Sequence, residues 1–363
     1  MKKQVLSMGL CLLLLLSGCA SLLERSHSTE TAHVQFSDAE KDSDVLQAET
    51  YQGLMSALLF LVSQGEETGV IRLYNYTGSA ESDLETAGVE LTQEDPLGAY
   101  AVDYMKYELS RVMNYYEVEI DISYRRSYEE ISQVVSVTGA SAIVGELRTM
   151  LAEFQGAAAL QVSYFEKGMT ISDVEALVME AYYSTPDSAL GRPEVSVTLY
   201  PQETEGRRRL VEIVLTYPEE GEQLQNKKAA LLAYVQELSL AEVAGTAQEK
   251  VAWVQDFLGE QVVLSGEAGG EDATAYAALL EGAANEEGLC LAAKLLCDGM
   301  GISAQVVQGQ QYDKARFWLV IGLEDYARHW NPAEETAVLR SDSELAALGY
   351  SWEAGVPACA DLE

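Results

Sequence analysis

Few side chains in this sequence could carry nucleophilic chemistry. After its first 50 residues, the 363-residue chain contains three cysteines, Cys290, Cys297 and Cys359, and one histidine, His329. Acyl transfer by a cysteine needs a thiolate, a base that generates the thiolate and a group that orients the base. A cysteine enzyme built from this chain would therefore depend on His329 as its base, with Cys290 as its nucleophile.

Two of these cysteines lie on a predicted amphipathic helix over residues 286–300. Its apolar residues recur at helical spacing; they are Leu289, Ala292, Ala293, Leu296 and Met300. Cys290 lies at the edge of this stripe, where a free cysteine packs as a small hydrophobic residue. Cys297 lies two turns further along the axis, too far from Cys290 for a disulfide. The pattern favours buried structural thiols.

The start of this helix has a simple local explanation. Asn285 can cap the helix by accepting a backbone N–H bond, which places Glu286 and Glu287 in the first turn. The helix dipole favours negative charge there, and it would equally lower the pKa of a cysteine at that place. Capping and the helix dipole are therefore compatible with either a glutamate or a reactive cysteine in the first turn.

The sequence around this helix resembles a known family. Residues 274–310, TAYAALLEGAANEEGLCLAAKLLCDGMGISAQVVQGQ, and residues 316–332, RFWLVIGLEDYARHWNP, are similar to the core of the transglutaminase-like superfamily, in the bacterial branch related to papain-fold cysteine proteases. The matched positions are Ala275-Tyr276, Leu279, Gly282, Gly288, Leu295-Leu296, Gly301-Ile302 and Val307-Gln308-Gly309. The resemblance covers roughly residues 245–363 and implies a papain-like α+β domain there.

The resemblance fails at the catalytic positions. It places Glu286 where the family has its nucleophilic cysteine and Arg316 where it has its histidine. The third position falls on His329 or, with a shift of register, on Asn331, and the family's groove tryptophan falls on Trp318. Arginine stays protonated and cannot act as a base. The resemblance thus implies a degenerate triad without catalytic residues. It also predicts a salt bridge between Glu286 and Arg316, with His329 or Asn331 behind Arg316.

The N-terminus, MKKQVLSMGLCLLLLLSGCASLL, has the features of a secretion signal. Lys2 and Lys3 precede an apolar run that is too short to span a membrane comfortably. The run ends in Leu16-Ser17-Gly18-Cys19, which resembles the lipobox of bacterial lipoproteins, where the cysteine is acylated. We expect residues 1–18 to be a signal peptide, Cys19 to carry lipid, and residues 19–50 to be a flexible tether outside the cytoplasm.

Residues 51–240 are predicted to form an N-terminal α/β domain of unknown function. Helical and alternating patterns follow one another, with one helix expected over residues 95–116 and a strand hairpin over 194–218. The fold class is therefore α/β (α+β), an α/β sandwich followed by the transglutaminase-like domain. The sequence contains no clear tandem repeat, no phosphate-loop glycine pattern and no metal-ligand cluster, so no cofactor is expected.

The net charge of the chain limits the kinds of partner that it can bind. With 23 basic and 58 acidic residues the formal charge is -35, and loss of Lys2 and Lys3 with the signal peptide would make it 21 − 58, or -37. Such a charge disfavours binding to nucleic acid. The sequence predicts a cell-surface lipoprotein that is not an enzyme and has a peptide, protein or peptidoglycan partner. The alternatives are a cell-envelope hydrolase or acyltransferase using Cys290 and His329, and a protein whose N-terminal domain is the functional part.

Overall fold

The structure is a computed structural model that describes residues 45–202, 207–266 and 269–361. The predicted signal peptide, Cys19 and most of the predicted tether lie outside the described residues. The first described element is strand β1 (Val45–Ala48), which pairs in parallel with strand β2 (Thr68–Tyr74). The end of the segment expected to be a tether is thus part of a sheet. Among the described residues, no helix has both the length and the apolar character needed to cross a membrane.

The first sheet is built by residues 45–124, here called the first repeat. Its elements are β1, α2 (Tyr51–Gln64), β2, α3 (Ala80–Val89), a π-helical turn (Glu90–Glu94), α4 (Pro96–Ala101), β3 (Val102–Val112) and β4 (Tyr115–Tyr124). The strand order is β1-β2-β4-β3. The Thr50 hydroxyl caps α2 by accepting the Gly53 N–H at 3.2 Å, and Gly65 ends this helix in the left-handed region.

The helix predicted over residues 95–116 is wrong beyond Ala101. Strand β3 follows instead, and it pairs with β4 along its length. Met105 and Leu109 are four residues apart, which fits one face of a helix, but two steps of a strand bring the same side chains to one face of a sheet. Tyr107 lies between them on that face and is partly buried, like both of them, so the period of two is the correct one.

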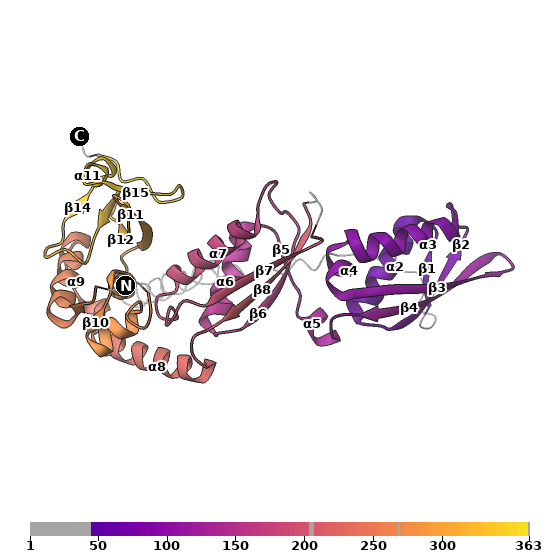
Figure 1. The fold of residues 1–363 in the computed structure, drawn as a ribbon, viewed down its shortest axis with the longest axis horizontal. Coiled ribbons are helices and arrows are strands. Elements are labelled where there is room, and N and C mark those ends of the chain that lie inside the picture. The colour runs from indigo at the N-terminus through magenta and orange to yellow at the C-terminus, as the bar shows by residue number, and fades with distance from the viewer. Residues whose placement is uncertain (1–44, 203–206, 267–268, 362–363) are drawn as a thin grey trace, which may run out of the picture. The chain divides into compact units, whose positions relative to one another are not determined.

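Residues 128–216 form a second repeat with the same topology. Its elements are α5 (Tyr128–Ser132), β5 (Val135–Val137), α6 (Ala140–Ala152), β6 (Ala157–Val162), α7 (Ile171–Ser184), β7 (Glu194–Tyr200) and β8 (Arg209–Thr216). The strand order β5-β6-β8-β7 matches that of the first repeat, with one parallel and two antiparallel pairings in each sheet. Figure 1 shows the two sheets with their helices. This structural repeat was not visible in the sequence.

The C-terminal region, residues 240–361, is preceded by α8 (Gly221–Glu237). It contains a 3-10 turn (Leu240–Glu242), α9 (Ala247–Gln261), β9 (Val263–Leu264), a π-helical turn (Ala277–Glu281), β10 (Ala283–Ala284), α10 (Glu286–Gly299), β11 (Ala304–Gln311), β12 (Lys314–Gly322), β13 (Ala327–Trp330), β14 (Leu339–Arg340), α11 (Asp342–Ala347) and β15 (Tyr350–Trp352). The five-stranded sheet has the order β14-β13-β12-β11-β15. Helix α10 followed by β11, β12 and β13 is the order of elements that the resemblance implied. The fold is α+β, as expected.

The two faces of this sheet have different neighbours. Side chains alternate between faces along β12, so Phe317 and Leu319 share the core of α10. Trp318 and Val320 belong to a separate cluster with Cys359. The core around α10 also contains the apolar residues of α6 and α7, so the second repeat and the C-terminal region share one core. The first repeat has a core of its own, joined by Ala159 and Leu210 of the second repeat.

Candidate functional site

The start of α10 has the predicted cap. Asn285 Oδ1 accepts the Gly288 N–H at 3.0 Å, and Glu286 and Glu287 occupy the first turn. A side chain at Gly288 is excluded because its Cβ would lie 2.3 Å from the carbonyl oxygen of Asp272. The loop before the helix therefore packs against the backbone of the first turn. Only a glycine at this position permits that approach.

Glu286 and Arg316 form the predicted salt bridge, through Arg316 Nη1 and Glu286 Oε1. The side chains are 20% and 33% exposed, so the pair is partly buried, and Arg316 Nε is buried without a hydrogen-bond partner among the described residues. The second carboxylate oxygen of Glu286 is 3.5 Å from the Phe317 backbone N–H. The two positions that the resemblance assigns to nucleophile and base are thus in contact, as an ion pair.

Glu287 makes a second ionic contact that the sequence did not predict. Its buried carboxylate accepts a hydrogen bond from Tyr183 Oη of α7 at 2.9 Å and one from Arg192 Nη2 at 3.0 Å. Arg192 Nη2 also contacts Tyr183 Oη, and the ring of Tyr183 lies 6.1 Å from that of Phe317. This group, the Glu287 cluster, joins the second repeat to the C-terminal region. Glu287 looked like an ordinary first-turn acid, because a partner far away in sequence leaves no local pattern.

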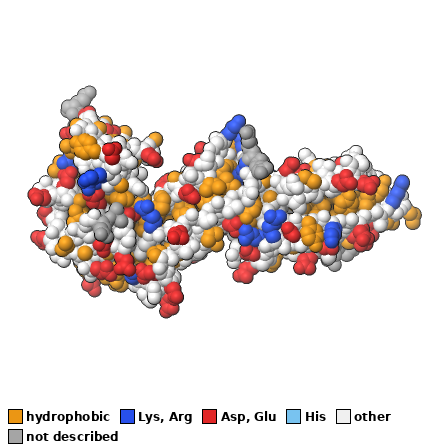
Figure 2. All heavy atoms as spheres, viewed as in Figure 1, with side chains coloured by type: hydrophobic (Ala, Val, Ile, Leu, Met, Phe, Trp, Pro, Cys, Tyr) orange, Lys and Arg blue, Asp and Glu red, His pale blue; other side chains and the backbone are white. Residues whose placement is uncertain are grey.

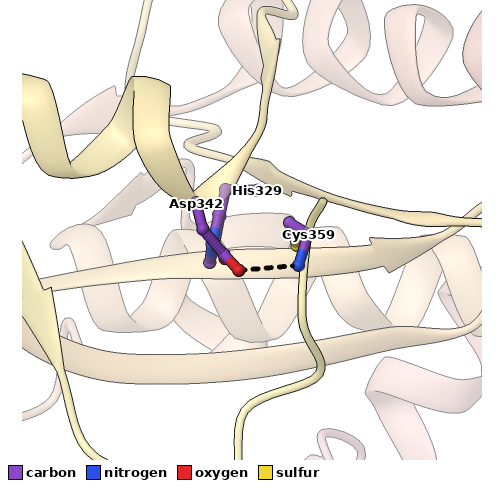
Figure 3. Close-up of side chains that lie close together, drawn as sticks. All are labelled: His329, Asp342 and Cys359. Carbon is purple, nitrogen blue, oxygen red and sulfur yellow. Dashed lines mark hydrogen bonds and ion pairs between the residues drawn. The ribbon is translucent and has the colours of Figure 1, made fainter. Parts of the chain in front are cut away.

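His329 lies on β13 in a different polar network. Its Nδ1 accepts the indole N–H of Trp318 at 3.0 Å, and its Nε2 lies 2.8 Å from Asp342 Oδ1. Asp342 Oδ2 accepts the Cys359 backbone N–H at 3.1 Å (Figure 3). Indole can only donate, so Nδ1 carries the lone pair and Nε2 carries the proton that Asp342 accepts. We call this set of residues the His329 network. Its donors are the neutral Trp318 indole, the neutral His329 ring and the Cys359 backbone N–H, and its one charged group is the Asp342 carboxylate.

The same tautomer argues against a metal at this place. Side-chain ligand atoms of His329, Asp342 and Cys359 all lie within 4.8 Å of one another. A cation at Nε2 would displace the only ring proton and leave an imidazolate, because Nδ1 is already an acceptor. The Cys359 thiol is also a poor ligand, since burial raises its pKa to about 11 and metals bind the thiolate. The donor set does not fit a metal ion.

The His329 network also lacks a free base and a reactive thiol. Both ring nitrogens of His329 are hydrogen-bonded, and burial lowers the pKa of the ring below its ordinary value, with Asp342 opposing. Cys359 Sγ contacts the carbonyl oxygen of Pro357 at 3.6 Å. Neither Asp342 nor Cys359 was singled out in the sequence as a site residue, because nothing in their spacing links them to His329.

Cys290 and His329 are not brought together. Cys290 packs in the core around α10, whereas His329 is paired with Val320, on the opposite face of the sheet. Burial raises the pKa of the Cys290 thiol well above its ordinary value, and the neighbouring Glu286 and Glu287 raise it further. Burial likewise raises the pKa of Cys297 to about 12. All three described cysteines are free and buried.

Three expectations about the degenerate triad need correction. His329 is not behind Arg316: it pairs with Val320, four residues along β12, or roughly 13 Å away along the strand. The amide of Asn331 binds the Ala333 N–H at 2.9 Å and contacts Tyr350 Oη at 3.4 Å instead of Arg316. Trp318 lines no groove, because it is fully buried.

Beside the Glu287 cluster lies a cavity of about 510 Å³. Its walls come from the α7–β7 loop, from the start of α8, from residues 269–281 and from the facing ends of β11 and β12. Phe317 and Glu287 contribute to its floor. A volume of this size is typical of small-molecule and peptide sites. The cavity adjoins the first turn of α10, where the resemblance places the reactive end of the helix.

Comparisons with known proteins add little to this geometry. No family model matches the chain, and no curated protein matches it. Among solved structures, LapG of Legionella pneumophila (EGTA-treated) is 12% identical and is matched over 40% of this chain and 81% of its own, with a TM-score of 0.26. A protein described as a TGase is 10% identical over 56% of this chain and 62% of its own, with a TM-score of 0.28. TM-scores this low carry no argument about family or activity.

Proposed function

We propose that this chain is a lipid-anchored binding protein of the bacterial cell surface whose transglutaminase-like region does not catalyse acyl transfer. The observation that carries the proposal is the ion pair of Glu286 and Arg316. These residues occupy the positions of nucleophile and base in the family that the sequence resembles. A carboxylate held by a guanidinium offers neither a thiolate nor a proton acceptor for one.

The arrangement of the remaining thiols supports the same conclusion. A rearranged enzyme would need Cys290 and His329 in contact, and the sheet separates them. Cys290 is fully buried with a raised pKa, and a buried thiol in apolar surroundings is inert. No contact among the described residues favours the rearranged enzyme.

Turnover and thiol reactivity test the proposal together. The purified full chain should incorporate no amine, deamidate no glutamine and hydrolyse no peptide, and its thiols should react slowly with iodoacetamide. A Glu286→Cys variant should be alkylated at least about tenfold faster than any native thiol, because the helix start and Arg316 lower the pKa of a thiol there. Rapid labelling of native Cys290 that disappears in His329→Ala would contradict the proposal.

The anchor is tested separately by cell fractionation. An acylated Cys19 would hold the chain to a bilayer through its buried methylenes, at about 0.8 kcal/mol each. Wild type should remain with the membrane and Cys19→Ala should be released, with Cys11→Ala as the matched control that stays. Equal membrane retention of wild type and Cys19→Ala would refute lipid attachment at Cys19.

A further inference from the structure

The cavity beside the Glu287 cluster combines groups from two parts of the chain. Leu190 and Arg192 come from the α7–β7 loop, and Lys227 comes from α8. Ala315 and Phe317 of β12 line the other side. Because Arg192 comes from the second repeat and Lys227 from α8, the cationic groups lie outside the C-terminal region, and the cavity is a feature of how this chain combines its parts.

We propose that this cavity binds a short peptide by its C-terminal carboxylate, with Arg192 as the anchor; this inference rests on the binding role proposed above. Arg192 hydrogen-bonds to Glu287 and Tyr183 through Nη2, and its guanidinium carbon lies 5.9 Å from the centre of the Tyr183 ring. None of the described hydrogen bonds uses its Nε or Nη1. Its side chain is 45% exposed and lines the cavity. A guanidinium held at one end offers its other donors to a planar carboxylate as a charge-assisted pair.

Glu287 holds this guanidinium in position. The carboxylate is buried and fixed by Tyr183 as well as by Arg192, so the arginine is oriented before any ligand arrives. A preoriented anchor loses less conformational entropy on binding. The apolar part of the lining, from Leu190, Pro218, Ala273, Ala315 and Phe317, is suited to small side chains next to the bound carboxylate.

The remaining charges of the lining limit what can bind. Four carboxylates face two cations; they are Glu219, Glu271, Glu281 and Glu287 against Arg192 and Lys227. Lys227 is already paired with Glu219. Acidic side chains are also spread over the face of the molecule seen in Figure 2, in line with the net charge of -35. A ligand with one carboxylate can use the Nε and Nη1 donors that Arg192 keeps beside its bond to Glu287, whereas a second negative charge would meet only carboxylates or Lys227, which is paired with Glu219.

Calorimetric titration of the full chain in mild detergent tests the proposal with three matched probes. N-acetyl-trialanine carries one terminal carboxylate, its C-terminal amide carries none, and N-succinyl-trialanine carries a second carboxylate at the opposite end. The first should bind measurably at up to about 1 mM peptide, and the other two should bind at least about tenfold more weakly, because each loses the charge-assisted pair or adds repulsion.

Variants locate the binding to this cavity. Arg192→Gln should weaken binding of N-acetyl-trialanine at least about tenfold, and Arg192→Lys should be intermediate because lysine lacks the planar fork. Ala315→Trp fills the cavity from an exposed strand position and keeps Arg192 and Glu287, so it should abolish binding even if Arg192→Gln disturbs the fold. Arg111→Gln on β3, an exposed arginine of the first repeat, is the control that should bind like wild type.

Each result has one meaning. Equal affinity for the acid and the amide, wild-type affinity in Arg192→Gln or Ala315→Trp, or no heat from any probe would overturn the carboxylate site while leaving the absence of catalysis untouched. Binding followed by hydrolysis of the peptide would keep the site and overturn the proposed non-catalytic function. Binding of the acid alone, lost in both cavity variants and without turnover, would support both.

Discussion

The start of α10 and the His329 network hold their polar groups in different ways. At the helix end, Glu286 and Glu287 each hold an arginine, one from β12 and one from the second repeat, next to an open cavity. In the His329 network, His329 and Trp318 are almost or fully buried, and the segment around Cys359 packs over them. The first arrangement consists of two ion pairs, whereas the second has one carboxylate, the partly exposed Asp342, beside buried neutral groups.

This difference supports the proposal that the chain does not catalyse acyl transfer. Catalysis of that kind needs nucleophile, base and orienting group within hydrogen-bond reach of one another. Here the residues at the first two positions meet at the start of α10, while His329 is oriented by Trp318 and Asp342 and pairs with Val320, four residues further along β12. His329 is fixed by two hydrogen bonds, and the pKa of the one described thiol near it, that of Cys359, is raised by burial.

The largest effect is expected at Glu287. Replacement by alanine removes two hydrogen bonds and leaves Tyr183 Oη buried without its acceptor, so the free energy of unfolding should fall by about 3 kcal/mol. Urea unfolding of the full chain measures this change, and Tyr183→Phe, which deletes only the hydroxyl, should lose about 1 kcal/mol. A loss below about 1 kcal/mol for Glu287→Ala would mean that the cluster does not hold the second repeat to the C-terminal region.

A smaller loss is expected in the His329 network. Asp342→Ala removes the acceptor of the His329 Nε2–H and of the Cys359 N–H, but Asp342 is partly exposed, so water can replace part of the interaction. The free energy of unfolding should fall by about 2 kcal/mol, measured by the same urea titration. Asp325→Ala, at an exposed position between β12 and β13, is the control. A larger loss for Asp342→Ala than for Glu287→Ala would mean that the His329 network contributes more to stability than the Glu287 cluster does.

The closed network should also depend on pH. Protonation of His329 would put a proton on Nδ1, opposite the Trp318 N–H, and burial lowers its pKa in the folded chain. The unfolded chain takes up that proton at its ordinary pKa of about 6.5. Stability should therefore fall as the pH drops from about 7.5 through 6.5 and below, because the unfolded state then binds more protons. His329→Gln should show a flatter profile; identical profiles would disprove neutral burial of this ring.

The smallest effect is expected for the partly solvated ion pair of Glu286 and Arg316. A double-mutant cycle on Glu286→Gln and Arg316→Gln should give a coupling energy of about 0–1 kcal/mol, because both side chains are partly solvated. Raising the salt concentration should reduce it further. A coupling energy near that of a buried pair, about 3 kcal/mol or more, would show that the pair of Glu286 and Arg316 is shielded from solvent.

Local patterns predicted local features well. The cap at Asn285 and the ion pair of Glu286 and Arg316 were predicted from helix physics and from the resemblance. The amphipathic stripe of α10 was only partly right, because every residue from Glu287 to Cys297 is buried. The strand at β3 was missed because Met105 and Leu109 satisfy both periods. The Glu287 cluster was missed because Tyr183 lies 104 residues away. Contacts of this range depend on how the second repeat packs, which no short pattern in the sequence encodes.

The structural repeat was hidden for a related reason. Each sheet requires only an alternation of apolar and polar residues, and many unrelated sequences satisfy it. The two copies therefore share strand order and connections but no recognisable sequence motif.

The core shared by the second repeat and the C-terminal region has a consequence for how the chain opens. An apolar cluster that runs through both parts cannot be exposed in one without exposing the other, so these parts should melt as one cooperative block. The first repeat keeps a cluster that is mostly its own and can fluctuate on its own. Amide hydrogen exchange should then divide the chain between α5 and β5, with protection rising or falling together on the C-terminal side of that boundary.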